Sequence, residues 1–198
     1  MNPYALTAHT LTSALGAGLG ATLAGLRGAR SGLRPCDFPQ ADLATWIGRV
    51  DGLEALRLTG ALAGFDCRNN RLADLALRQD GFEAAITDAR ARYGAHRIGV
   101  FMGTSSAGIL ETEDAYRARD AQSGALPASF NFNGAHSMYS LAAFVQARLG
   151  LNGPAMVVST ACSSSAKAFG NAVRMIEAGF CDAALVGGVD TLCLTTLY

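Results

Sequence analysis

The chain has 198 residues, of which 50% are hydrophobic and 16% are charged, and 16 lysine and arginine residues balance 16 acidic ones. This composition predicts one globular domain that is long enough to bury a core. The balanced charge excludes the strong electrostatic field with which proteins attract nucleic acid or an anionic membrane. No apolar run reaches the roughly 18 residues that a membrane span needs, so we expect neither kind of partner.

The cysteines form no C-x-x-C pair, and no histidine lies beside them at the spacing of metal ligands. The five cysteines are Cys36, Cys67, Cys162, Cys181 and Cys193. An odd count, together with an N-terminus that lacks a basic segment followed by an apolar one, indicates reduced thiols in a cytoplasm. We therefore expect a cytoplasmic protein without a metal ion or cofactor.

The first half of the chain gives mixed signals. In chain order, the patterns predict a strand over residues 4–12, a short helix over 19–26, a loop over 28–35, irregular structure over 36–55 and a helical pattern from 71 to 93. The helical part is the clearest, because its apolar residues recur every three to four positions up to Gly94.

The second half alternates apolar runs with helical patterns. The predicted elements are a buried strand over 97–103 ending in a Gly/Ser-rich turn, a helix over 111–119, a loop over 124–127, a helix over 137–149, a strand over 155–160, a helix over 163–178 and a strand over 183–186. Strands that alternate with helices predict an α/β fold with a largely parallel sheet.

One junction between a strand and a helix carries a thiol. Cys162 follows the predicted strand 155–160 and precedes the helix that begins near Ser163. A helix N-terminus has free N–H groups and a partial positive charge, which favour the thiolate form of a cysteine. The same N–H groups, that of Cys162 first, point where an oxyanion would form, so Cys162 is a candidate nucleophile. The other four cysteines lack this context, and we interpret them as structural.

The helix after Cys162 has little polar surface. Cys162, Ala166 and Gly170 form one nearly flat stripe at a spacing of four residues, and apolar residues cover most of the remainder. Such a helix is expected to be buried in the core and closely packed against another element.

The segment Thr160-Ala161-Cys162-Ser163-Ser164-Ser165 resembles the nucleophile motif of elongating β-ketoacyl-acyl-carrier-protein synthases and of the ketosynthase domains of polyketide synthases. The similarity extends over most of the chain and is most specific at the cysteine. Further matching segments are residues 179–190, 149–154 and 98–104, with a weaker match at 13–20 and 31–33.

The resemblance implies the thiolase fold, in which two similar β/α halves form a five-layer sandwich. Residues 1–198 would then be the N-terminal half-domain, with the C-terminal half absent. The implied activity is that of a 3-oxoacyl-acyl-carrier-protein synthase in fatty acid or polyketide synthesis. An acyl chain would pass from the phosphopantetheine of its carrier protein to Cys162, and a malonyl-carrier would lose carbon dioxide and attack the thioester.

The resemblance also implies substrate contacts and an assembly. By family position, Ser106 and Met138 line the acyl pocket, while Ala161 and Ser163, which flank the nucleophile, are also expected to contact the substrate. The helix that starts at 137 is expected near a dimer interface, and strand 155–160 is expected to pair across a two-fold axis. The partners are therefore an acyl carrier protein and either a second copy or a partner ketosynthase chain.

One departure from the family limits the expected activity. The family needs two histidines from its second half, which also supplies the second oxyanion donor. The histidines present here, His9, His96 and His136, match none of the family's histidine motifs. We therefore expect that this chain alone does not catalyse condensation, so that it is either a fragment or a split enzyme that a partner chain completes.

Three other functions remain open at this point. Gly16-Ala17-Gly18-Leu19-Gly20-Ala21, followed by Asp37, weakly fits a dinucleotide-binding turn. The segment 103–107, with Ser105 at its centre, approximates the nucleophile turn of a serine hydrolase. A non-catalytic half-domain that serves a partner chain is the third alternative.

Overall fold

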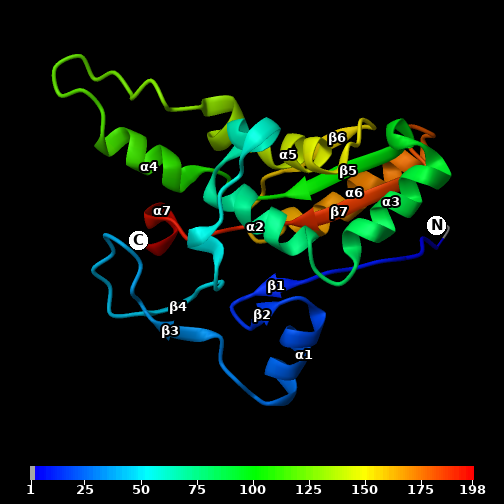
Figure 1. Ribbon diagram of the computed structural model, residues 1–198, viewed down its shortest axis with the longest axis horizontal. Coiled ribbons are helices and arrows are strands. Elements are labelled where there is room, and N and C mark those ends of the chain that lie inside the picture. Colours follow the sequence, from blue (N-terminus) through cyan, green and yellow to red (C-terminus); the bar gives the residue numbers. More distant parts are fainter. Residues whose placement is uncertain (1–2) are drawn as a thin grey trace.

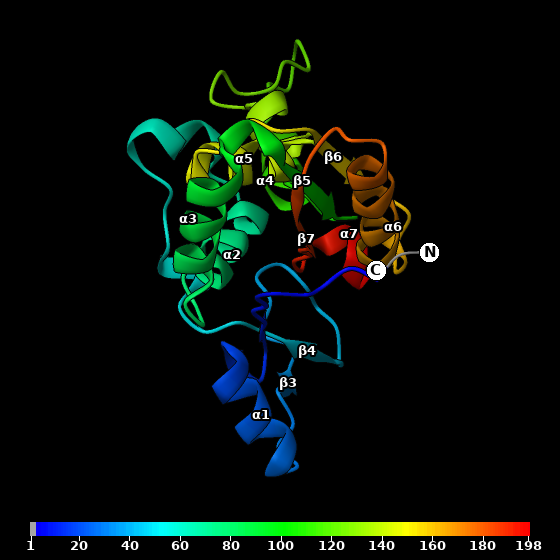
Figure 2. The same ribbon diagram turned by 90° about the vertical axis from the view of Figure 1, so that its right-hand side faces the viewer.

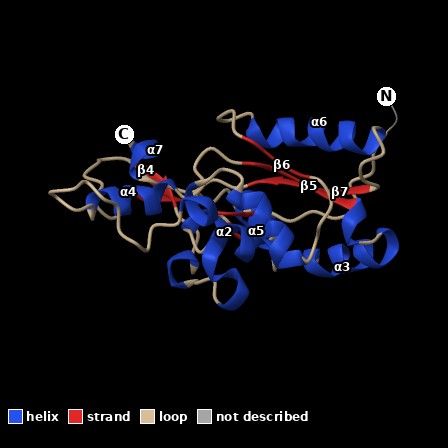
Figure 3. Ribbon diagram, turned by 90° about the horizontal axis from the view of Figure 1, so that it is seen from above, coloured by secondary structure: helices blue, strands red, loops and turns tan. Residues whose placement is uncertain are grey.

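The computed structural model describes residues 3–198, and a parallel three-stranded sheet lies at its centre (Figure 1). The strands are β5 (Ile98–Gly103), β6 (Ala155–Val158) and β7 (Ala183–Gly188), in the order β6-β5-β7. Helix α6 (Ser164–Glu177) covers one face of the sheet, and α2 (Arg68–Leu77), α3 (Phe82–Tyr93) and α5 (Ser140–Leu149) lie on the other (Figure 3). The predicted α/β class and parallel sheet are confirmed.

The remaining elements form a smaller N-terminal part, pack around the sheet or connect its strands. They are β1 (Thr12–Ser13), β2 (Gly16–Ala17), α1 (Leu19–Arg27), β3 (Leu33–Pro35), β4 (Trp46–Gly48), η1 (Leu53–Ala55), η2 (Gly60–Phe65), α2 (Arg68–Leu77), α3 (Phe82–Tyr93), η3 (Ala95–Arg97), α4 (Ile109–Arg117), η4 (Phe132–His136), α5 (Ser140–Leu149) and α7 (Leu194–Leu197).

Strand β5 divides its side chains between the two faces of the sheet, because successive residues of a strand point in opposite directions. Ile98, Val100 and Met102 belong to the main core beneath α2 and α5. Phe101 belongs to the smaller core beneath α6. All six residues of β5 are buried, as the continuous apolar run predicts for a central parallel strand.

The elements α1, β3 and β4 form a lobe that projects from the sheet domain (Figure 2). One polar contact joins the lobe to the turn between α2 and α3. Both carboxylate oxygens of Asp80 accept from the Leu19 N–H at the start of α1, at 3.0 and 3.1 Å. The carboxylate therefore stabilises the positive end of α1 from a position 61 residues away in sequence.

Several predictions for the N-terminal half are wrong. Residues 4–11 form no strand, because no other strand among residues 3–198 pairs with them. The predicted loop and irregular region instead contain β3 and β4, which pair antiparallel. The predicted helical pattern is interrupted at residues 78–81, where Asp80 (φ 56°) and Gly81 (φ 70°) adopt left-handed backbone conformations that end one helix and start the next.

The expected all-round burial of α6 is also wrong. Only Ser164, Ala168 and Ala172 of this helix are buried. Phe169 on its outer face is 49% exposed. The apolar residues of α6 would suit burial on most sides of the helix. Within residues 3–198, however, other elements pack against only one side of it.

Among residues 3–198, no helix combines the length and the apolar character required to cross a membrane.

A buried carboxylate links helices α2 and α5, which lie on the same face of the sheet. Asp74 of α2 is 1% exposed and accepts from the Arg148 Nε of α5 at 2.8 Å. The same carboxylate accepts from the Arg78 guanidinium at 2.5 Å. Because α5 packs directly on β5 and β6, this ion pair helps to fix the layer that supports the sheet.

Replacing Asp74 by alanine should lower the free energy of unfolding by about 1.5–3 kcal/mol, because two guanidinium groups lose a buried charged acceptor, although Arg148 keeps its ion pair with Glu83. Urea denaturation followed by circular dichroism measures this change. The matched control is Asp88→Ala, which removes an exposed carboxylate from α3. Equal stability of the two variants would contradict a structural role for the ion pair.

Candidate functional site

Cys162 lies in a tight turn between the end of β6 and the start of α6. The turn comprises residues 159–163, and Ala161 has φ 52°, in the left-handed region. A residue with a side chain pays about 1 kcal/mol or more to adopt this conformation, and it does so only where its surroundings enforce it. The strain is therefore located at the residue directly before the candidate nucleophile.

The hydroxyl of Ser164 enforces this turn from the first position of α6. Ser164 is 2% exposed, and its Oγ accepts from the Thr160 N–H at 2.8 Å. The same Oγ donates to the Ala161 carbonyl at 2.7 Å. One buried hydroxyl thus holds both residues that precede Cys162.

The first two serines after Cys162 do not cap helix α6 with their hydroxyl groups. Ser163 occupies the N-cap position, but its hydroxyl makes no cap hydrogen bond and donates back to the Thr160 carbonyl at 2.9 Å. Ser164 is engaged with the turn. The hydroxyls therefore shape the turn rather than satisfy the first amides of α6.

Among residues 3–198, neither the thiol nor the backbone amide of Cys162 has a partner. The residue is exposed. The next two amides, those of Ser163 and Ser164, donate to the Thr160 and Ala161 carbonyls. In the described chain, residues 3–198, the Cys162 N–H has no acceptor. A free N–H beside an accessible sulfur is the arrangement that stabilises the oxyanion formed when a thiolate attacks a carbonyl group.

Two glycines allow α6 to approach the sheet closely. Gly103 ends β5 and pairs with Gly188 at the end of β7. A Cβ atom on Gly103 would lie 2.5 Å from the Ser165 nitrogen, and one on Gly188 would overlap the Ser165 hydroxyl. The ends of β5 and β7 therefore present backbone without side chains. The first turn of α6 packs directly against this backbone, next to the Cys162 turn.

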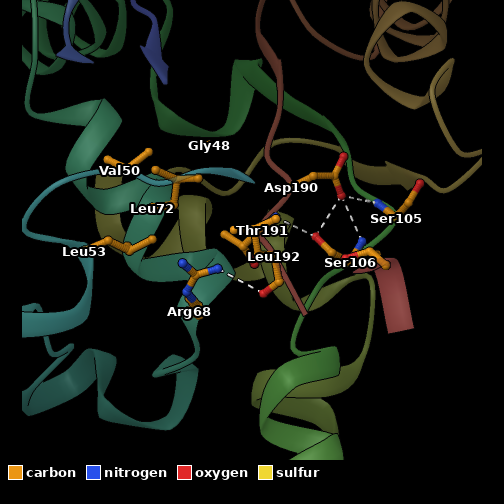
Figure 4. Close-up of a pocket in the computed structure, with 11 residues that line it drawn as sticks. Gly48, Val50, Leu53, Arg68, Leu72, Ser105, Ser106, Asp190, Thr191 and Leu192 are labelled. Atoms are coloured by element: carbon orange, nitrogen blue, oxygen red, sulfur yellow. Dashed lines mark hydrogen bonds between the residues drawn. The ribbon is translucent and has the colours of Figure 1, made fainter. Parts of the chain in front are cut away.

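A cavity of about 370 Å³ lies next to this region, and Ser106 contributes to its wall (Figure 4). The cavity is lined by Gly48, Val50, Leu53, Arg68, Leu72, Ser105, Ser106, Asp190, Thr191, Leu192 and Thr196. The Ser106 hydroxyl donates to Asp190 at 2.9 Å and accepts from the Thr191 N–H at 2.9 Å. Its polar atom is thus already occupied, so its contribution to a ligand site is mainly its small size.

The structure brings some of the predicted residues together. Ala161, Cys162 and Ser163 share the turn. Ser106 lies on the cavity wall, with Ser105 as the link between the cavity and the turn. Met138 is half-buried between η4 and α5 and is not among the residues that line this cavity.

Sequence reasoning missed the structural importance of Ser164 and Asp190. Nothing in a run of three serines distinguishes the buried one from the other two. Asp190 follows an apolar strand and two glycines, a position where polar residues often serve ligands or turns, and this was an available signal.

The structure does not support the dinucleotide-binding alternative. Gly16 and Ala17 pair antiparallel with Thr12 and Ser13, whereas a dinucleotide-binding turn requires a parallel βαβ unit. The serine-hydrolase alternative also lacks its partners, because the Ser105 Oγ contacts the Ser164 Oγ at 3.3 Å. No histidine among residues 3–198 hydrogen-bonds to Ser105.

Comparison with known proteins decides the family. The family model of the β-ketoacyl synthase N-terminal domain matches residues 70–197. The chain belongs to the β-ketoacyl synthase family. The matched region contains the sheet, the Cys162 turn and the Asp190 segment.

Curated relatives of this β-ketoacyl synthase chain are polyketide synthases. It is 38% identical over 109 residues to polyketide synthase ThaG of Burkholderia thailandensis, a match that covers 54% of the chain and 2% of ThaG. It is 31% identical over 175 residues to the non-reducing polyketide synthase dpmaA of Metarhizium anisopliae, covering 79% of the chain and 7% of that protein. The chain therefore spans only a small part of these long relatives.

Solved structures show the same fold. The ketosynthase ApeO in complex with its chain length factor ApeC, from Xenorhabdus doucetiae, gives a TM-score of 0.73 at 27% identity, over 94% of this chain and 47% of that chain. The ishigamide ketosynthase/chain length factor gives a TM-score of 0.70 at 22% identity, over 93% and 53%. These neighbours confirm the predicted thiolase-like α/β fold, and this β-ketoacyl synthase chain spans about half of each.

Alkylation with iodoacetamide at neutral pH should label Cys162 first. Cys67, Cys181 and Cys193 are buried, and burial raises the pKa of the Cys67 thiol to about 12, so that it stays protonated. We expect Cys162 to react about tenfold faster than these three, as measured by peptide mass spectrometry over time. The half-buried Cys36 is the internal reference. Uniform labelling of all five thiols would contradict a formed site.

Replacing Gly103 by alanine should displace the Cys162 turn, because the added Cβ would collide with the backbone of α6. We expect a loss of about 1–3 kcal/mol in the free energy of unfolding and slower Cys162 alkylation. The matched control is Gly187→Ala on β7, where the nearest atom to an added Cβ is the flexible Met102 Cε at 3.5 Å. If both variants resemble the wild type, the close approach is not a constraint.

Proposed function

We propose that this chain carries the acyl-accepting centre of a 3-oxoacyl-acyl-carrier-protein synthase, with Cys162 as its nucleophile. The observation that carries the proposal is the exposed Cys162 in a strained strand-to-helix turn, with its own N–H free. Membership of the β-ketoacyl synthase family supports this role for the cysteine.

The first half-reaction follows from this geometry. The Cys162 thiolate attacks the carbonyl carbon of an acyl thioester on the carrier. The carbonyl oxygen becomes negatively charged and accepts a hydrogen bond from the Cys162 N–H. A new carbon–sulfur bond to Cys162 forms, the carbon–sulfur bond to the carrier breaks, and the carrier leaves as a thiolate that takes up a proton. The product is an acyl-enzyme thioester at Cys162.

The second half-reaction is the decarboxylative condensation of this thioester with a malonyl-carrier. The histidines of residues 3–198 make no hydrogen bond to the Cys162 turn, and the His136 Nδ1 instead contacts the Thr112 hydroxyl at 2.6 Å. We therefore propose that the groups that drive decarboxylation lie outside residues 1–198, in the same protein or in a partner chain. The small Ser106 on the cavity wall fits a long or bulky acyl chain.

The partners follow from the same proposal. One solved relative is a type II polyketide acyl-carrier protein in complex with its ketosynthase, and another is a ketosynthase in complex with its chain length factor. We propose an acyl carrier protein as the donor and a second ketosynthase-like chain as the structural partner. Polyketide assembly is favoured over fatty acid synthesis because the curated relatives are polyketide synthases.

Incubation of the chain with acyl carrier protein that bears a series of acyl thioesters tests the proposal. We expect intact mass spectrometry to show one acyl group on Cys162, and no 3-oxoacyl product when malonyl-carrier is added. Cys162→Ala should abolish acylation, whereas Cys36→Ala should not. Rapid alkylation of Cys162 without any acylation would instead identify a non-catalytic half-domain.

A further inference from the structure

Asp190 links the end of β7 to the turn between β5 and α4. Its Oδ1 atom accepts from the Ser105 N–H at 2.7 Å, the Ser106 N–H at 2.9 Å and the Ser106 hydroxyl at 2.9 Å (Figure 4). The Thr104 hydroxyl adds a fourth contact at 3.2 Å. One carboxylate oxygen therefore fixes three consecutive residues of the turn.

The turn held by Asp190 touches the Cys162 turn. The Ser105 Oγ lies 3.3 Å from the Ser164 Oγ. The Ser164 Oγ is the atom that bonds to the Thr160 N–H and to the Ala161 carbonyl. Asp190 thus holds the Ser105 backbone, and the Ser105 side chain contacts Ser164, which binds the two residues before Cys162.

We propose that Asp190 is a positioning residue for Cys162, acting through Ser105 and Ser164. A hydrogen bond to a carboxylate is roughly twice as strong as one between neutral groups, so Asp190 holds the 104–106 turn more rigidly than a neutral acceptor would. The rigid turn supports the buried Ser164 hydroxyl, and this hydroxyl keeps Ala161 in its strained conformation. The inference rests on the proposed function, because positioning matters only if Cys162 reacts.

Asp190→Ala, made in the 198-residue chain, tests this directly. We expect the rate of Cys162 alkylation by iodoacetamide to fall about tenfold. The rates at Cys36 and at the buried Cys67 should stay unchanged. A merely structural defect would speed the labelling of buried cysteines, so this selectivity separates positioning from loss of stability. Asp190→Asn should restore part of the rate, because its amide oxygen still accepts hydrogen bonds.

Asp182→Ala is the matched control. Asp182 directly precedes β7, at the opposite end of the strand from Asp190, and pairs with Arg97 at 2.8 Å. Its loss removes a carboxylate of the same type without touching the 104–106 turn. Equal Cys162 rates in Asp190→Ala and Asp182→Ala would overturn the proposal.

Ser105→Ala gives a second test, which decides the question if Asp190→Ala does not fold. It removes only the hydroxyl that joins the two turns, and the Ser105 N–H still reaches Asp190. We expect slower Cys162 alkylation with an unchanged melting temperature, and an unchanged rate would overturn the relay. If wild-type Cys162 is alkylated but never acylated, the proposed function is refuted. The alkylation rates of the variants then still decide whether Asp190 positions Cys162.

Discussion

The close contact between the first turn of α6 and the glycine ends of β5 and β7 is the constraint on which the site depends. Gly103 and Gly188 present no side chain to Ser165, so the helix starts directly above the sheet. A helix that starts so close leaves only five residues, 159–163, in which the chain must reverse from strand to helix. The left-handed Ala161 and the exposed Cys162 are consequences of that short connection.

Polar groups of helix α2, on the opposite face of the sheet from α6, complete this arrangement. Asn69 of α2 is fully buried, and its amide donates to the Thr104 hydroxyl at 3.2 Å. Thr104 in turn contacts Asp190, so the main helical layer, the sheet ends and the Cys162 turn share one network. Buried networks of this kind specify a single geometry when every member has a partner. Hydrogen bonds and close backbone contacts, rather than the packing of large side chains, therefore hold the Cys162 turn in place.

The elements around the site could be predicted from sequence because their signals are local. The apolar run at 97–103, the strand pattern at 155–160 that leads into Cys162 and the helical spacing after Ser163 are each contained in one short stretch of the chain, and the structure reproduces β5, α6 and β7 within a few residues. The β3–β4 pair could not be predicted, since each three-residue strand acquires its character from a partner elsewhere in the chain. The break between α2 and α3 carried the signal of an Asp80-Gly81 dipeptide, which is typical of turns.

Strand β6 pairs with β5 on one side only, and in residues 3–198 nothing pairs with its other edge. Its sequence, Ala-Met-Val-Val, contains neither a charged residue nor a proline, the two features with which natural edge strands prevent unwanted pairing. Those four residues lead directly into the Cys162 turn. An unpaired sheet edge of the kind that can accept another strand thus lies directly beside the turn that holds Cys162.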